Sequence, residues 1–99
     1  MKITIQALNF TAKEALLAFV EKRLNKLSQF YDKIISVDVK LKELPGGDKN
    51  KGVEILLNIP GDDLIVKKTA NSFEEALDEN VKALERSLRK WKERQKTKN

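Results

Sequence analysis

The 99-residue sequence contains no cysteine and no histidine. Without cysteine the chain cannot form a disulfide scaffold, a cysteine-ligated zinc finger or a thiol nucleophile. Without histidine it lacks the commonest general base and the commonest metal ligand of proteins. Most hydrolase and oxidoreductase sites therefore cannot be assembled from this sequence, and we expect no catalytic residues, no metal site and no cofactor.

Long hydrophobic runs are also missing. No apolar stretch approaches the roughly 20 residues of a membrane span, and Met1 leads into a charged segment rather than a signal peptide. A composition of 40% hydrophobic and 35% charged residues is typical of a globular protein. We therefore expect one soluble, cytoplasmic domain over residues 1–96, followed by a frayed C-terminal tail at residues 97–99.

Positive charge is concentrated at one end of the sequence. The chain has 20 Lys+Arg and 15 Asp+Glu, a formal net charge of +5. Residues 81–99 hold 8 basic and 2 acidic residues, a net +6, whereas residues 1–80 hold 12 basic and 13 acidic residues, a net −1. Such a concentration indicates a polyanionic partner, above all a nucleic acid.

Alternating hydrophobic residues predict four strands, over residues 2–8, 35–43, 53–59 and 64–70. Three consecutive apolar residues near the start of the last segment leave its inward face ambiguous. In the other three segments we expect one face to be buried, formed by Ile3, Ile5, Ala7, Ile35, Val37, Val39, Leu41, Val53, Ile55, Leu57 and Ile59.

Two further segments have the spacing of amphipathic helices, and each is preceded by a capping box. Thr11 with Glu14 predicts the start of the first helix, which should close between Ser28 and Asp32. Ser72 with Glu75 predicts the start of the second, which should fade between residues 92 and 96. The expected buried stripes are Leu16, Phe19, Val20, Leu24 and Leu27, and then Phe73, Leu77, Val81, Leu84, Leu88 and Trp91.

The predicted order of elements is therefore β-α-β-β-β-α. Helices and strands with one apolar face each favour an α+β two-layer sandwich, in which two helices pack on one face of a four-stranded sheet. The other face of the sheet should be in contact with water. Its expected residues are Lys2, Thr4, Gln6, Ser36, Asp38, Lys40, Lys42, Glu54 and Asn58.

The second helix presents the clearest candidate for function. On a helical wheel four basic residues lie well away from its apolar stripe and form a solvated ridge: Lys82, Arg86, Arg89 and Lys90. Acidic residues at a helix start and basic residues at its end also suit the helix macrodipole. The dipole explains the polarity of this helix but not the number of its basic residues, so we interpret the ridge as a phosphate-binding surface.

The first helix adds Lys22, Arg23 and Lys26. Lys22 and Lys26 are neighbours on a polar face, whereas Arg23 falls inside the apolar stripe. One interpretation is an arginine whose stem packs while its guanidinium reaches water. A compatible interpretation is that the guanidinium emerges beside the second helix, positioned for phosphate.

Two modes of RNA binding are disfavoured. Stacking of bases on the sheet requires aromatic side chains there, but every aromatic residue lies on a predicted helix or at a helix end. Double-stranded-RNA-binding domains dock phosphates at the start of their last helix, where this chain has Glu74, Glu75, Asp78 and Glu79. Trp91 fits the core better than a stacking role, and Asp62-Asp63 fits a turn better than a divalent-ion site.

Several segments together are similar to those of a known family. They are the opening strand Met1–Ile5, residues 19–27, the capped helix entry Ser72-Phe73 followed by Ala76-Leu77, and residues 84–90. In order and spacing, over about residues 1–96, the sequence resembles the ribosome hibernation promoting factors, also called ribosome-associated inhibitors or sigma-54 modulation proteins.

The resemblance implies a factor that binds the small ribosomal subunit, against 16S rRNA, in the channel used by messenger and transfer RNA. It implies silencing of translation and protection of idle ribosomes in stress or stationary phase. The family's basic positions on the two helices match Arg23, Lys26, Arg86 and Lys90. One further basic position falls on Ala83, although Lys82 is adjacent.

The resemblance is to the short members of the family, which lack the second domain that pairs ribosomes. We therefore expect a chain that is monomeric when free and does not dimerise ribosomes alone. The alternative hypothesis is a protein-interaction module that modulates a sigma factor or another acidic protein. Neither hypothesis involves a membrane or a small-molecule substrate.

Overall fold

The computed structural model describes residues 1–97 and confirms the predicted order of elements. Residues 98 and 99 of the expected tail lie outside the described residues, and Thr97 is the last residue of a helix. The elements are β1 (Lys2–Leu8), α1 (Glu14–Phe30), β2 (Ser36–Glu43), β3 (Lys51–Ile59), β4 (Asp62–Ala70) and α2 (Phe73–Thr97).

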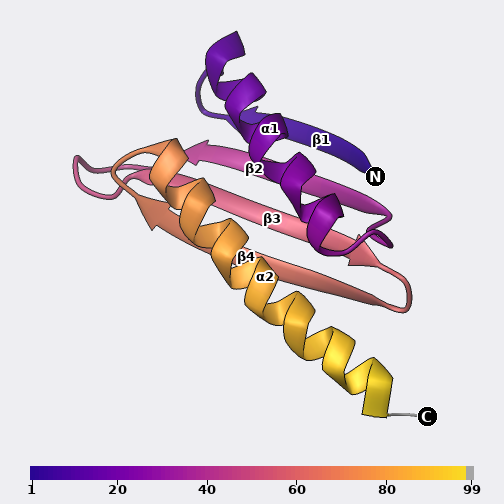
Figure 1. Ribbon diagram of the computed structural model, residues 1–99. Coiled ribbons are helices and arrows are strands. Elements are labelled where there is room, and N and C mark those ends of the chain that lie inside the picture. Colours follow the sequence, from indigo (N-terminus) through magenta and orange to yellow (C-terminus); the bar gives the residue numbers. More distant parts are fainter. Residues whose placement is uncertain (98–99) are drawn as a thin grey trace.

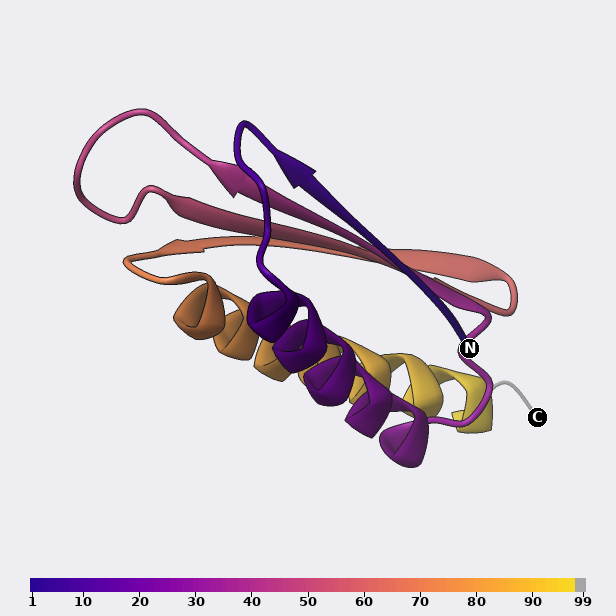
Figure 2. The same cartoon turned by 90° about the horizontal axis from the view of Figure 1, so that it is seen from above.

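The four strands form one sheet in the order β1-β2-β3-β4 (Figure 1). β1 and β2 are parallel, and α1 makes the crossover that a parallel pair requires. β2, β3 and β4 are antiparallel neighbours. Both helices cover the same face, as the view from above shows (Figure 2), so the predicted α+β two-layer sandwich is confirmed.

The core lies between this face of the sheet and the two helices. Val37, Val39 and Leu41 of β2 are at most 1% exposed, and the stripes of both helices pack onto them and their neighbours. Trp91 is buried at 9% exposure and meets the Tyr31 ring edge to face, with centroids 5.6 Å apart. Neither helix in the described part of the chain is long and apolar enough to cross a membrane.

Two residues predicted in the core are exposed. Ile35 is 55% exposed because β2 begins at Ser36, one residue later than predicted, and the preceding Ile34 takes the buried position. Phe19 is 38% exposed because the buried residues of α1 are Val20, Leu24 and Leu27. Phe19 therefore falls at the edge of the buried stripe.

The start of α1 differs from the prediction. The helix begins at Glu14 after Lys13, whose side chain makes no capping hydrogen bond, so the predicted capping box of Thr11 is wrong. The physical reason is a contact made by the connection before it. Phe10 stacks on Phe73 at the start of α2, with ring centroids 4.7 Å apart, and so fixes the path of the chain into α1.

The second helix begins as predicted but ends later. The Ser72 hydroxyl accepts a hydrogen bond from the Glu75 N–H at 3.1 Å. The helix continues through residues 92–96, where the sequence predicts fading. Contacts of Trp91 with Tyr31, and of Lys92 with the end of α1, hold this part of the helix in place.

The β3–β4 hairpin shows which face of β4 is buried, a point that the sequence left open. Gly61 has φ +80, a conformation that glycine adopts without strain, and β4 begins immediately afterwards. Leu64 and Val66 face the helices, whereas Ile65 is 60% exposed on the other face. The turn consists of Pro60 and Gly61, whereas Asp62 and Asp63, which the sequence placed in the turn, belong to β4; the strand therefore begins two residues earlier than predicted. The Asp62 carboxylate accepts a hydrogen bond from the Asp63 N–H at 2.8 Å.

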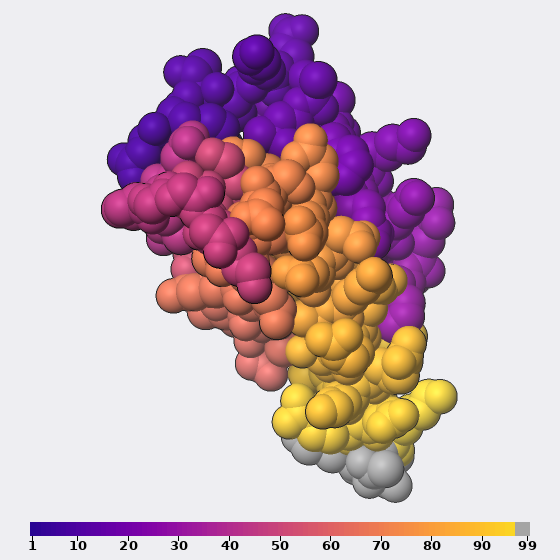
Figure 3. Space-filling view, turned by 90° about the vertical axis from the view of Figure 1, so that its left-hand side faces the viewer, coloured from indigo at the N-terminus to yellow at the C-terminus, as the bar shows by residue number. Residues whose placement is uncertain are grey.

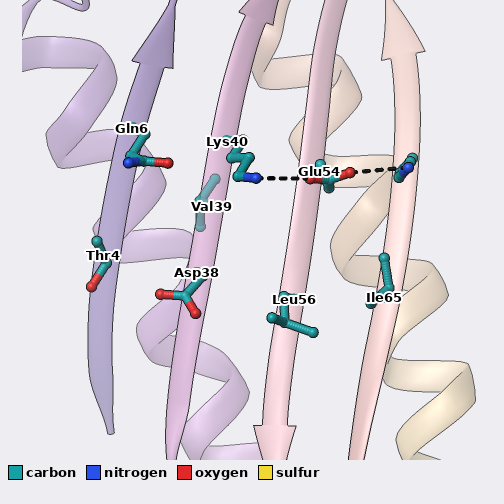
Figure 4. Close-up of a pocket in the computed structure, with 9 residues that line it drawn as sticks. Thr4, Gln6, Asp38, Val39, Lys40, Glu54, Leu56 and Ile65 are labelled. Atoms are coloured by element: carbon teal, nitrogen blue, oxygen red, sulfur yellow. Dashed lines mark ion pairs between the residues drawn. The ribbon is translucent and has the colours of Figure 1, made fainter.

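The open face of the sheet is polar, as predicted, with an apolar strip that the sequence did not reveal. Glu54 pairs with Lys67 at 3.2 Å and with Lys40 at 3.8 Å across three strands (Figure 4). Leu56 and Ile65 lie beside this row in a shallow hollow of about 470 Å³. The Lys67 ammonium, which hydrogen-bonds the Glu54 carboxylate, lowers the pKa of Glu54.

Candidate nucleic-acid interface

The basic helices α1 and α2 lie side by side on one face of the sheet. In the space-filling view α2 forms a continuous surface with α1 along one side (Figure 3). Six of the seven predicted binding residues are exposed on these helices, and Arg23 is half-buried. We call the set the basic helix face: Lys22, Arg23, Lys26, Lys82, Arg86, Arg89 and Lys90.

The buried stripe of α2 determines where these side chains point. Leu77, Val81, Leu84 and Leu88 are at most 1% exposed, which fixes the rotation of the helix about its axis. Residues on the opposite side of the wheel must then face water, and Arg86 does so. Lys22 and Lys26 of α1 are exposed in the same way, one helical turn apart.

Arg23 reaches α2, but there it meets a carboxylate. Its Nη2 atom lies 2.7 Å from Oδ1 of Asp78, and the side chain is 23% exposed. The other carboxylate oxygen of Asp78 lies 3.1 Å from Nζ of Lys82. The stem of Arg23 is therefore packed while its head emerges beside the second helix, and both sequence interpretations of its position are compatible with this geometry.

The cluster of Arg23, Asp78 and Lys82 is an electrostatic unit with a net positive charge. Hydrogen bonds from Arg23 and Lys82 lower the pKa of the Asp78 carboxyl, so the carboxylate stays ionised at neutral pH. One carboxylate thus holds two cations in fixed positions at the junction of the helices. The spacing of Asp78 and Lys82 was readable from the sequence, but the contact with Arg23 joins residues 55 positions apart and was not.

A second group of cations surrounds the last residue of α1. Nζ of Lys92 lies 5.1 Å from the centroid of the Phe30 ring and 3.4 Å from the Phe30 carbonyl oxygen. The guanidinium carbon of Arg89 lies 5.9 Å from the same centroid. Sequence reasoning selected Arg89 but not Lys92, whose partner is identifiable only once the two helices are placed side by side.

Asn80 is a structural residue that sequence reasoning missed. It is fully buried on α2, and its amide nitrogen donates to the carbonyl oxygens of Val53 at 2.8 Å and Val66 at 3.1 Å. These bonds attach α2 to β3 and β4 and so set the height and rotation of the basic helix face. The available signal was a single amide residue inside an otherwise apolar stripe.

Within residues 1–97 no group of three or more Asp or Glu side chains is placed to hold a metal ion. What the two helices offer chemically is a set of ammonium and guanidinium donors on a folded platform. Such groups bind phosphate oxygens by charge and hydrogen bonds, and arginine does so in a bidentate manner. The geometry is that of an anion-binding surface.

Solved structures have the same fold. One is a ribosomal subunit interface protein from Coxiella burnetii, with a TM-score of 0.83 and 21% identity, covering 93% of this chain and 98% of that one. Another is the N-terminal domain of Thermus thermophilus Protein Y, with a TM-score of 0.77 and 25% identity, covering 92% of this chain and 99% of that one.

Sequence comparisons agree with the fold. The ribosome hibernation promotion factor of Deinococcus radiodurans is 30% identical over 88 residues. This match covers 87% of the chain but 46% of that protein, so the chain spans about half the length of this relative. Residues 3–96 match the model of one family along nearly the whole sequence. The chain therefore belongs to the sigma 54 modulation protein / S30EA ribosomal protein family.

Proposed function

We propose that this protein is a cytoplasmic ribosome hibernation factor. It binds the small ribosomal subunit in the channel used by messenger and transfer RNA, silences translation, and protects idle ribosomes in stress or stationary phase. The observation that carries the proposal is the basic helix face, on a fold and in a family whose relatives include a ribosome hibernation promotion factor.

The chemistry of the basic helix face favours RNA as its partner. Exposed lysine and arginine side chains neutralise backbone phosphates without reading bases. Four of the six aromatic rings pack in pairs, Phe10 with Phe73 and Tyr31 with Trp91, rather than forming a platform for bases. Recognition would therefore depend on the shape of the RNA and on its charge.

The mechanism that fits this surface is steric occlusion. A folded body with a sheet on one side and phosphate-binding helices on the other occupies space that messenger and transfer RNA need. No covalent chemistry is required, and the protein acts as a binding protein rather than an enzyme. About four to eight phosphate contacts would make the affinity fall steeply with salt.

Sedimentation with purified ribosomes tests the proposal. We expect the protein to pellet with the small subunit and not with the large one, more strongly at low than at moderate salt. Messenger RNA with initiator transfer RNA should displace it, because they occupy the same channel. Failure to pellet at low salt, or pelleting that these RNAs do not reduce, would contradict the channel assignment.

A second candidate function is modulation of a protein partner, and the family description, which includes sigma 54 modulation, favours it. The partner would present an acidic surface to the basic helix face, as on a sigma factor. The two candidates differ in their response to ribonuclease. Binding to ribosomes that is lost after digestion of the RNA supports the first, and retention on a purified sigma factor supports the second.

A further inference from the structure

The C-terminal half of α2 carries a hollow that shares only Arg89 with the basic helix face. It lies where α2 passes the end of α1, and its volume is about 260 Å³. The last residue of α1, Phe30, contacts α2 at Arg89 and Lys92, and α2 continues beyond the end of α1 (Figure 1). The residues that line the hollow are Phe30, Arg89, Lys92, Glu93 and Lys96.

The three basic residues of the hollow share one face of α2. Spacings of three and four residues, from Arg89 to Lys92 to Lys96, place side chains above one another on a helix. Arg89 and Lys96 are exposed, and Lys92 is half-buried. Three cationic side chains against the single carboxylate of Glu93 give the lining an excess of positive charge.

The Phe30 ring holds two of these cations in place. Nζ of Lys92 lies 5.1 Å and the guanidinium carbon of Arg89 lies 5.9 Å from its centroid, both within the range of a cation–π interaction. An aromatic ring positions a cation without neutralising its charge. Arg89 and Lys92 are therefore brought to one place while their charge remains available to an anion.

Lys92 also has a structural role at the end of α1. In α1, which the structure describes in full, no basic residue stands in the last turn. Lys92 supplies the missing charge from the neighbouring helix, because its ammonium donates to the Phe30 carbonyl at 3.4 Å. Arg89 and Lys96 are more exposed than Lys92 and are therefore more accessible to a ligand.

We propose that this hollow is a phosphate-binding subsite, in which Arg89, Lys92 and Lys96 hold a backbone phosphate of RNA beside the Phe30 ring. Arginine offers the bidentate donor pair that a phosphate accepts, and the two lysines add charge. The inference rests on the proposed function for the source of the phosphate. A free nucleotide presents the same group, and the experiment distinguishes the two sources.

The test is an NMR titration of the full chain, labelled with ¹⁵N, against a short uridine oligonucleotide and separately against uridine triphosphate. Trp91 is the single tryptophan and, together with Lys92 and Lys96, lines the hollow that adjoins this one, so its indole N–H reports on this end of α2. We expect saturable shifts at Trp91 and at the Phe30 amide. Tighter binding of the oligonucleotide identifies an RNA backbone site, and equal or tighter binding of the triphosphate identifies a free-nucleotide site.

Substitutions distinguish binding at the subsite from a general effect of positive charge. Arg89→Gln and Lys92→Gln should each weaken the response at Trp91 about threefold, the size of an exposed charge contact. Lys2→Gln removes the same charge from an exposed position outside both the hollow and the basic helix face, and it should leave that response unchanged. Equal weakening by all three variants, or no shift at Trp91 and Phe30, would overturn the proposal.

Two controls keep the outcome interpretable. Lys92→Gln can lower the melting temperature by removing the cap of α1. In that case the result for Arg89→Gln tests the subsite, because Arg89 is exposed and makes no contact with the Phe30 carbonyl in the described structure. Sedimentation of the wild type tests the proposed function independently. Ribosome binding without shifts at the hollow overturns this inference alone, and shifts without ribosome binding overturn the proposed function alone.

Discussion

The two faces of the molecule differ in how their basic side chains are balanced. On the open face of the sheet Lys40 and Lys67 both reach Glu54, and with Asp38 in the same hollow the two lysines are matched by two carboxylates (Figure 4). On the helix side, residues 86–92 carry four basic residues and no acidic residue. The comparison teaches that the number of lysines does not identify an interface; the position of uncompensated charge does.

The largest effect we expect concerns Asn80, which attaches α2 to the sheet. Asn80→Asp would place a carboxylate against the carbonyl oxygens of Val53 and Val66, in a fully buried position. We expect the free energy of unfolding to fall by about 3 kcal/mol, because the new charge has neither water nor a donor. Urea denaturation measures this. Wild-type stability would show that Asn80 does not attach α2 to the sheet.

The next largest effect is on ribosome binding, and it distinguishes the helix side from the rest of the surface. Arg86→Glu with Lys90→Glu should weaken ribosome binding at least about tenfold, because four units of charge change on the surface that meets phosphates. Thermal stability should stay nearly unchanged, since both residues are exposed. The matched control is Lys2→Glu with Lys49→Glu, which makes the same charge change at exposed positions outside the helices. An equal loss of ribosome binding in both double variants would show that binding depends on net charge and not on the position of the basic residues.

A smaller and mixed effect is expected at the junction of the helices. Arg23→Glu would bring a second carboxylate to Asp78, 2.7 Å from the present guanidinium position. We expect weaker ribosome binding and a loss of about 1 kcal/mol of stability, because Arg23 is largely packed and Asp78 is partly exposed. Arg23→Met keeps the packed stem and should recover most of the stability but not the binding. If Arg23→Glu matched the wild type in both measurements, the junction would have no role.

The smallest effect is a pH dependence of stability. The pKa of Asp78 is lowered in the folded state by Arg23 and Lys82, and that of Glu54 by Lys67. A lowered folded pKa contributes stability that is fully present above the unfolded pKa, and this stability is lost as the pH falls from about 5 through the folded pKa. Melting temperatures across this range should decline, and less steeply in Arg23→Met. An identical decline in that variant would remove the Arg23–Asp78 pair from the explanation.

Most of the fold follows from local patterns in the sequence. Strict alternation predicted most of β2 and β3, and helical spacing predicted most of both buried stripes, because each pattern has one periodicity and one apolar face. Two of the errors occur where a distant contact overrides a local signal. The start of α1 depends on Phe10 stacking against Phe73, and the length of α2 depends on Trp91 packing against Tyr31.

The residues of the candidate site could be predicted from the sequence, but their contacts with the neighbouring helix could not. Wheel positions alone placed Arg86 and Lys90 in water, and the structure agrees. The carboxylate that receives Arg23, and the ring that holds Lys92, are contributed by the other helix. A single sequence does not specify such pairings, because they depend on how two helices pack on a common sheet.

Site-specific photo-crosslinking tests the central claim most directly. A benzoylphenylalanine would replace Arg86 on the basic helix face or Ile65 on the open face of the sheet, both exposed positions. On irradiation with small ribosomal subunits, we expect crosslinks to 16S rRNA from position 86 and few or none from position 65. Crosslinks to that RNA from position 65 alone would contradict the account and identify the open face as the RNA-binding surface.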